Sequence, residues 1–405
     1  MNRRNFTQLL TFGAGSLGLG AQNQDETQST LTDDLQSEEE DARLQRRPSH
    51  LEPVNVADFK ALARSKLATA TYDYISTGSA DEITLRENVA AFKRIKVVPP
   101  LMRGVSEADA STTALNQPIS LPILLAPVAA QRMFHPSGAL AAARAATAAG
   151  TIFGVSSSAG SSVEEIARAS PGPKWFQLYV PRDRAVARQL VERVERAGYQ
   201  AIIVTVDLGE WKDADRRNRF ALPKEMLVKH LRDVGFHQVS DQMSDQEVNE
   251  FNQSAWDLSL TWEFFDWLRS ITKLPLLIKG LLRQEDARRA VSIGLDGIIV
   301  SNHGGRKLDT MPASIDRLAE VVEAVGNRAE VYMDGGIRRG TDVLKAVALG
   351  ARAVLIGRPY AWALAADGEA GVRKVIELLA EEFLNAMTAT GCARISDIEA
   401  SLISW

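Results

Sequence analysis

Eight short apolar runs between residues 122 and 359 constrain the fold of this chain more than any other feature of its sequence. They are bounded by Gly, Pro or Asp, and most are continuously apolar rather than alternating. Such strands are typical of parallel sheets that are covered on both faces. The runs are PILLAPVA from residue 122, TIFGVSS from 151, KWFQLYV from 174, AIIVTVD from 201, LPLLIKG from 274, GIIVSNH from 297, EVYMDGG from 330 and AVLIGRP from 353.

Segments with helical patterning separate most of these runs. Four of them, residues 137–150, 183–198, 284–294 and 339–350, end in a glycine, which suits a helix C-terminus. Strand and helix in eightfold alternation predict an α/β fold, a (β/α)8 TIM barrel with an N-terminal helical extension, and a doubly wound open sheet is the alternative. The pattern repeats without a fixed sequence period, which excludes a solenoid.

The first fifty residues differ in composition from the rest of the chain. Residues 1–21 place Arg3 and Arg4 before an apolar, glycine-rich stretch that is too short to span a bilayer as a helix. This layout resembles a twin-arginine export signal, and a frayed basic terminus is the alternative. Residues 22–50 are rich in acids and polar residues, as is typical of a disordered linker. We therefore expect a protein exported to the periplasm, or else a cytoplasmic one, with its barrel domain in residues 51–405.

Composition excludes several classes of protein. The chain has 47 basic and 51 acidic residues, a net charge of −4, and much of the acidic excess lies in the linker. A chain without a basic excess is not expected to bind nucleic acid. One cysteine, Cys392, excludes an internal disulfide framework and a cysteine-rich metal site. The spacing of His230, His237 and Asp241 fits no standard motif, so we predict no metal site.

Polar side chains stand at the ends of the predicted strands, and the C-terminal strand ends of such barrels carry the active site. One polar residue at a strand end is usually a turn former or a solvated charge, but polar residues around one rim indicate a site. They include Gln131, Ser156, Ser157, Gln177, Tyr179, Thr205, Asp207, Lys279, Ser301, His303, Asp334 and Arg358.

The last two loops, DGGIRRG and IGRP, occupy the positions where these barrels commonly bind phosphate. Gly335, Gly336 and Gly357 allow the backbone to approach a ligand closely. Arg338 and Arg358 supply positive charge. A phosphate site is therefore predicted in these two adjacent loops.

Several motifs occur together: YDYISTGSADEITL, FQLYV, TVD, LPLLIKG, GIIVSNHGGRKLD, DGGIRRG and IGRP. Together they resemble the FMN-dependent α-hydroxy-acid oxidase and dehydrogenase family, which includes glycolate oxidase, lactate oxidase and mandelate dehydrogenase. The resemblance runs from about residue 53 to Trp405, and Ser-Asn-His-Gly-Gly-Arg is its most specific element. It implies FMN-dependent oxidation of an L-2-hydroxy acid to the 2-oxo acid, with electrons passed to oxygen, a quinone or a cytochrome. It also implies a homo-oligomer, by resemblance a tetramer.

The resemblance implies a role for each residue of the His-Gly-Gly-Arg run. His303 is the implied base, because imidazole can take and return a proton near neutral pH. Asp207 is implied to pair with its ring and to stabilise the imidazolium. Arg306 is implied to bind the substrate carboxylate with a bidentate fork that lysine cannot reproduce.

Further implied contacts involve substrate and flavin. Tyr74 and Tyr179 match the two substrate-contacting tyrosines of the family. Lys279 matches a lysine beside N1 and O2 of the flavin, where its charge stabilises the reduced ring. The implied FMN contacts are Pro127, Val128, Ala129, Ser156, Gln177, Thr205, Lys279, Ser301, Asp334, Gly335, Gly336, Arg338, Gly357 and Arg358.

The chain departs from the family pattern in three places. In TVDLGEWKDADRRNRF, Lys212 is the residue nearest to the usual substrate arginine and lacks its bidentate fork. A non-catalytic barrel that binds FMN or a phosphorylated ligand is therefore the alternative function. Ser158 replaces the tryptophan of glycolate oxidase-like members, and a small residue there leaves room for a larger 2-substituent. The run 127–131 reads Pro-Val-Ala-Ala-Gln instead of Pro-Thr-Ala-Met-Gln, so one hydroxyl near the flavin is lost.

Residues 208–257 form the longest connection between predicted strands. A loop of this length in a compact domain is usually functional, so we predict a lid over the site. The segment is polar throughout and does not resemble a membrane-docking segment. We expect no membrane span in the mature chain.

Overall fold

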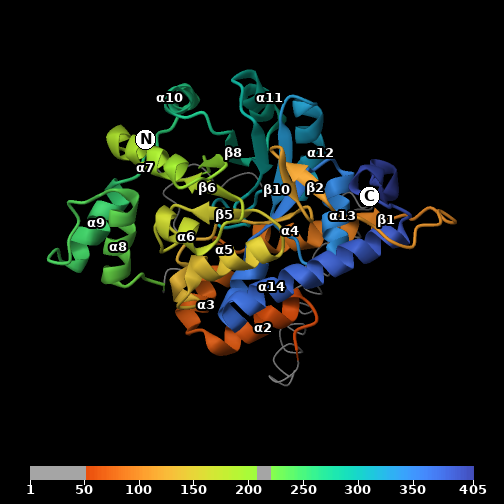
Figure 1. Cartoon of the computed structure of the whole chain (residues 1–405), viewed down its shortest axis with the longest axis horizontal. Coiled ribbons are helices and arrows are strands. Elements are labelled where there is room, and N and C mark those ends of the chain that lie inside the picture. Colours follow the sequence, from red (N-terminus) through yellow and green to blue (C-terminus); the bar gives the residue numbers. More distant parts are fainter. Residues whose placement is uncertain (1–51, 208–219) are drawn as a thin grey trace, which may run out of the picture. The chain divides into compact units, whose positions relative to one another are not determined.

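Eight parallel strands close into a barrel, in the order β10-β11-β4-β5-β6-β7-β8-β9. The structure, a computed structural model, describes residues 52–207 and 220–405, so the predictions for residues 1–50 and for Lys212 lie outside the described residues. Each predicted run forms one strand of the barrel, and the (β/α)8 prediction is confirmed (Figure 1). The strands are β4 (Ile123–Leu125), β5 (Phe153–Ser156), β6 (Lys174–Leu178), β7 (Ala201–Thr205), β8 (Leu276–Leu281), β9 (Gly297–Val300), β10 (Glu330–Asp334) and β11 (Ala353–Ile356).

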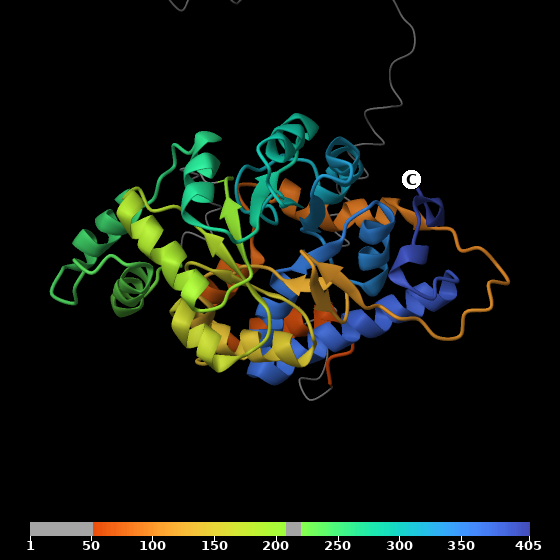
Figure 2. The same cartoon turned by 45° about the horizontal axis from the view of Figure 1, so that its top comes forward.

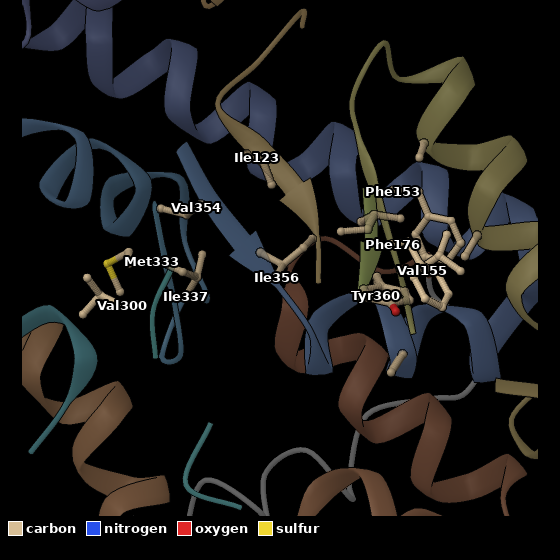
Figure 3. Close-up of a cluster of buried hydrophobic side chains, with 14 of the residues drawn as sticks. Ile123, Phe153, Val155, Phe176, Val300, Met333, Ile337, Val354, Ile356 and Tyr360 are labelled. Atoms are coloured by element: carbon tan, nitrogen blue, oxygen red, sulfur yellow. The ribbon is translucent and has the colours of Figure 1, made fainter. Parts of the chain in front are cut away.

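The strands are continuously apolar because both of their faces are buried. Trp175 on β6 and Tyr332 on β10 contact each other edge to face, with ring centroids 5.3 Å apart, although their strands are not neighbours. Both rings therefore lie inside the barrel. Phe176, the next residue of β6, belongs to the outer cluster (Figure 3). The same cluster contains Phe153 and Tyr360, whose rings meet edge to face with centroids 6.5 Å apart. One strand thus supplies side chains to two cores.

Helices cover the outside of the barrel. All four predicted helices are present, and the last and longest helix packs along the first helix of the chain's described part and along the helix after β4 (Figure 2). The helices that cover the barrel are α5 (Gly138–Ala148), α6 (Val163–Ala169), α7 (Arg184–Arg196), α10 (Glu263–Ile271), α11 (Gln284–Ser292), α12 (Ser314–Val325), α13 (Gly340–Ala348) and α14 (Arg358–Ala389).

The predicted N-terminal helical extension is also confirmed. It consists of α2 (Val56–Lys66), α3 (Thr69–Ser76) and α4 (Ile83–Arg94), and α2 packs on α14. The short elements outside the barrel are β1 (Lys96–Val97) paired with β12 (Ile403–Ser404), and the 3-10 helices η1 (Gln131–Met133), η3 (Ile395–Asp397) and η4 (Ala400–Leu402).

A β-hairpin closes the N-terminal end of the barrel. Its strands, β2 (Thr112–Ala114) and β3 (Gln117–Ile119), are joined by two residues with positive φ, as a tight hairpin turn requires. Ala114 and Ile119 pack in the inner cluster with Trp175. The N–H of Leu115, in the turn, donates to the carboxylate of Glu330, at the start of β10, over 2.9 Å. The hairpin thus fills the N-terminal end of the barrel.

The connection between β7 and β8 differs from the prediction. Its described part folds into α8 (Lys224–Val234), α9 (Asp245–Ser254) and α10, so the prediction of one long loop was wrong for these residues. The lid over the site stays a prediction. Ser244 and Glu247 form a capping box at the start of α9, a signal that the sequence contains. Within the part of the chain that the structure describes, no helix has the length and apolar character needed to cross a membrane.

Candidate active site

A cavity of about 270 Å³ lies at the C-terminal ends of the barrel strands. Most of the residues predicted for the site line it, and Asp207 and Ser301 lie directly behind two of them, hydrogen-bonded to His303 and Lys279. The predicted residues in the lining are Tyr74, Pro127, Val128, Ala129, Ser156, Gln177, Tyr179, Thr205, Lys279, His303, Arg306, Asp334, Gly335, Gly336, Arg338, Gly357 and Arg358.

His303 and Asp207 form a hydrogen-bonded pair between the ends of β9 and β7. The Nδ1 atom of His303 lies 2.9 Å from Oδ1 and 3.0 Å from Oδ2 of Asp207. Burial lowers the pKa of His303 to about 4, although the Asp207 carboxylate acts in the opposite direction. Burial also opposes the charge of Asp207, yet His303 and Lys279 hold the pKa of this carboxyl below its usual value. At neutral pH, a neutral imidazole therefore donates from Nδ1 to a carboxylate, and Nε2 is left as a base.

Three successive residues with positive φ turn the chain sharply after β9. The φ angles are 58° at His303, 65° at Gly304 and 71° at Gly305. A Cβ on Gly305 would lie 2.7 Å from the backbone N of Leu85, so only glycine fits against α4. The turn brings Arg306 back to the same cavity as His303.

Arg306 lies against the last turn of α3. Its Nη1 atom donates to the carbonyl of Tyr74 over 2.6 Å, and its guanidinium carbon is 5.0 Å from the centroid of the Tyr74 ring. The Tyr74 ring is also stacked on Phe220, with centroids 4.1 Å apart. These contacts fix a guanidinium and a phenol beside the base, a combination suited to a carboxylate.

The second tyrosine of the cavity is a hydrogen-bond donor. Tyr179 follows β6 directly, and burial together with the Asp207 carboxylate raises its pKa. Its phenol therefore stays protonated at neutral pH and can donate to a substrate oxygen.

Lys279 carries a buried positive charge on the cavity wall. Its Nζ atom donates to Ser301 Oγ over 2.8 Å and lies 2.9 Å from Asp334 Oδ2. Burial alone would lower the pKa of Lys279, but the carboxylates of Asp334 and Asp207 raise it above its usual value. The ammonium group is therefore fully charged and held in one place.

Unpaired polar atoms in the cavity wall match a flavin ring. Among the described residues, Gln177 Nε2, Thr205 Oγ1 and Asp334 Oδ1 are buried without a hydrogen-bond partner, and all three residues line the cavity. Buried polar atoms are nearly always paired, so these three indicate a polar ligand. The isoalloxazine and ribityl groups of FMN offer donors and acceptors of this kind, so the residues present fit this cofactor.

The phosphate end also fits FMN. α14 begins at Arg358, directly after Gly357, and both residues line the cavity. Helix N-termini bind phosphate through their free N–H groups. Arg338 lines the same end, and burial lowers its pKa to about 10, which still leaves it charged at neutral pH.

Arg358 has a structural role that was not predicted. Its guanidinium donates to three backbone carbonyls, those of Ile75 at 3.0 Å, Gly304 at 2.7 Å and Thr77 at 2.9 Å. It thereby joins the end of α3, which carries Tyr74, to the turn after His303. Its phosphate contact stays a prediction, but its position in the cavity is compatible with both roles.

Ser158, whose small side chain is expected to leave room for a larger 2-substituent, lies near His230. Ser158 Oγ lies 3.4 Å from Nε2 of His230 on α8, and His230 is buried. The other two residues considered as metal ligands, His237 and Asp241, are exposed. Across residues 52–207 and 220–405, no three His, Cys, Asp or Glu side chains lie close enough to hold a metal ion.

Among the residues around the site that sequence reasoning missed, four carry charged or aromatic side chains. Lys307 lines the cavity beside His303, and its place next to Arg306 in the motif could have indicated this. Phe220 contacts Tyr74, and Trp256 and His230 lie behind Tyr179 and Ser158. No local signal in the sequence indicates those contacts.

The chain is similar to a known protein family and to individual oxidases. The FMN-dependent dehydrogenase family matches residues 63–405 of the chain. Glycolate oxidase 1 of Oryza sativa subsp. indica is 50% identical over 350 residues, which cover 86% of this chain and 94% of that protein. 2-Hydroxyacid oxidase 1 of Homo sapiens is 47% identical over 354 residues, covering 86% and 95%. The crystal structure of mandelate oxidase with (S)-4-hydroxymandelic acid is 43% identical with a TM-score of 0.79, covering 87% of this chain and 98% of that one.

Proposed function

The chain belongs to the FMN-dependent dehydrogenase family, and from this premise we propose that it is an oxidase of a small L-2-hydroxy acid. It is an FMN-dependent enzyme that oxidises a 2-hydroxy acid to the 2-oxo acid. The comparisons give no support to a non-catalytic barrel. The observation that carries the proposal is the His303–Asp207 pair, which shares one cavity with Arg306.

The roles of the side chains follow from their chemistry. Arg306 and Tyr74 hold the substrate carboxylate at the rim, and Tyr179 donates to the 2-hydroxyl oxygen. Conversion of CH–OH to a carbonyl releases two electrons and two protons, and His303 takes one proton at Nε2. Asp207 stabilises the resulting imidazolium through Nδ1–H. FMN, when bound, would supply the acceptor for the two electrons and the second proton, and the positive charge of Lys279 would stabilise its reduced form.

We propose oxygen as the electron acceptor and glycolate or lactate as the substrate class. Support for oxygen comes from the relatives, which are named as oxidases. Support for a small substituent comes from the relatives named as glycolate oxidases. A larger aromatic acid such as mandelate is then expected to be oxidised more slowly.

The test of this function is anaerobic reduction. The purified protein is expected to show the visible spectrum of a bound flavin, and glycolate or L-lactate is expected to bleach it faster than L-mandelate. Readmitted air should restore the spectrum at once if oxygen is the acceptor. A flavin spectrum that none of these acids bleaches would contradict the proposed oxidation and favour a binding protein.

Replacement of Asp207 by Asn is expected to lower kcat by about 10²- to 10⁴-fold and to shift the acid limb of kcat/KM to lower pH. The carboxylate raises the pKa of His303, so its removal lets this pKa fall further below about 4. The base then stays neutral at lower pH, while its protonated form loses its counter-charge. Both proteins are compared with one substrate from about pH 3 to pH 8, so that ionisation of the substrate affects them equally. A limb that moves to higher pH would contradict this pairing.

Location and assembly are also proposed. We propose that residues 1–21 direct export to the periplasm, because Arg3 and Arg4 precede an apolar stretch and a flavoprotein must fold around FMN before it leaves the cytoplasm. Cell fractionation with and without these residues would test this. We propose a homo-oligomer, and light scattering of the purified protein would measure its mass.

A further inference from the structure

The connection between β7 and β8 places the ring of Trp256 against Tyr179. The two ring centroids are 6.3 Å apart and the ring planes meet at 69°, an edge-to-face arrangement. This distance and angle are within the favourable range for aromatic pairs. Phe236 contacts the Trp256 ring as well, with centroids 6.0 Å apart. Trp256 thus lies between the helices of the connection and a side chain of the cavity.

The backbone around Trp256 is fixed to the end of β6. Residues 255–257 run antiparallel to residues 180–182, directly after Tyr179. Two backbone hydrogen bonds of 2.8 and 2.9 Å join these segments, and Pro181 is paired with Trp256. The tryptophan and the tyrosine are therefore held in a constant register.

His230 supports the other side of Trp256. The two rings are stacked with centroids 5.8 Å apart and planes 20° apart. His230 is buried, and its Nε2 atom is 3.4 Å from Ser158 Oγ. The N–H of Ser158 donates to Ser156 Oγ over 3.1 Å, and Ser156 lines the cavity. One set of contacts therefore links the ends of β5 and β6 through the Trp256–His230 pair.

The helix that carries His230 is itself anchored. Lys229 of α8 is 3.2 Å from Glu165 on α6, and the carbonyl of Asp233 accepts a hydrogen bond of 2.6 Å from Arg193 on α7. Burial lowers the pKa of His230 to about 4, so its ring is neutral at the pH of ordinary assays. The stack is thus an uncharged support on a fixed helix.

We propose that Trp256, supported by His230, is a positioning residue that fixes the direction of the Tyr179 hydroxyl toward the substrate. Tyr179 can rotate about its side-chain bonds, and a hydrogen bond to a reacting oxygen depends strongly on distance and angle. The Trp256 ring restricts that rotation. The inference rests on the proposed substrate contact of Tyr179.

A double-mutant cycle tests whether Trp256 acts through Tyr179. Trp256→Ala is expected to lower kcat/KM about tenfold, and Trp256→Phe, which retains an aromatic ring, less than about threefold. In a Tyr179→Phe background, Trp256→Ala should cost less than about twofold further, because the hydroxyl it positions is already absent. The same tenfold loss in both backgrounds, or no loss in either, would overturn the proposal.

Phe236→Leu provides a matched control. Phe236 belongs to the same aromatic cluster, where it contacts Trp256 and Phe251. This change perturbs packing around Trp256 but keeps the ring that touches Tyr179, so kcat/KM is expected to stay within about twofold of wild type. A loss as large as that of Trp256→Ala would show that general packing, rather than the contact between the Trp256 and Tyr179 rings, is responsible.

A crystal structure of the FMN-loaded Trp256→Ala protein separates this inference from the proposed function. The Tyr179 ring is expected to rotate into the vacated space, whether or not the protein oxidises any acid offered. A rotated ring in a protein whose wild type is inactive on 2-hydroxy acids would reject the function and retain the positioning contact. A Tyr179 ring in the wild-type orientation would reject the positioning role.

Discussion

Replacement of His303 by glutamine is expected to lower kcat for a 2-hydroxy acid by about 10²- to 10⁴-fold while FMN stays bound. Glutamine is polar and of similar length, so it can keep a hydrogen bond to Asp207, which lies 2.9 Å from the imidazole. It has no basic nitrogen and cannot take the substrate proton. The measurement is kcat under saturating substrate, with the flavin content read from the visible spectrum of each preparation.

A second variant separates chemistry from backbone strain. His303 has a φ of 58°, in the left-handed region that asparagine adopts more readily than most residues. His303→Asn should therefore relieve strain yet be as inactive as His303→Gln. Loss of FMN or of folded protein in both variants would instead assign a structural role to His303.

The strands of the barrel could be predicted because their signal is local. A run such as AIIVTVD has no polar face, and this alone indicates a strand covered on both sides, as β7 is. The same rule located the site, since the residues after each strand lie on one rim by geometry. Thr205 and Lys279, on neighbouring strands, are paired in register and both line the cavity. The strands and the site could both be predicted without knowledge of how the connections between the strands pack.

Contacts between distant connections could not be predicted in this way. The contact of Ser158 with His230, 72 positions further along the chain, has no signal in the sequence around either residue. Similarly, Arg358 was interpreted from its motif, whereas its hydrogen bonds go to carbonyls of α3 and of the turn after β9. Such contacts depend on where separate segments meet, which no local pattern contains.

Replacement of Lys279 by methionine is expected to lower the free energy of unfolding by about 3–5 kcal/mol. The Nζ atom of Lys279 lies 2.9 Å from Asp334 Oδ2, and the two side chains are only 4% and 10% exposed. Without the ammonium group, the Asp334 carboxylate is left buried without its cation, and Ser301 loses a hydrogen bond. Urea unfolding of both proteins, each saturated with FMN, measures the loss. Bound FMN stabilises the folded state, so the two free energies of unfolding can be compared only when both proteins are equally saturated.

Asp334→Asn in the same chain is expected to recover most of this stability but not the turnover. The amide removes the buried negative charge that Lys279→Met leaves behind, so the unfolding free energy of the double variant should approach that of wild type. The positive charge that Lys279 places on the cavity wall remains absent, so kcat should stay low if this charge acts in the oxidation itself. A double variant as unstable as the single one would show that the uncompensated Asp334 charge is not the cause of the loss. A double variant with wild-type kcat would show that Lys279 stabilises the fold and takes no part in the chemistry.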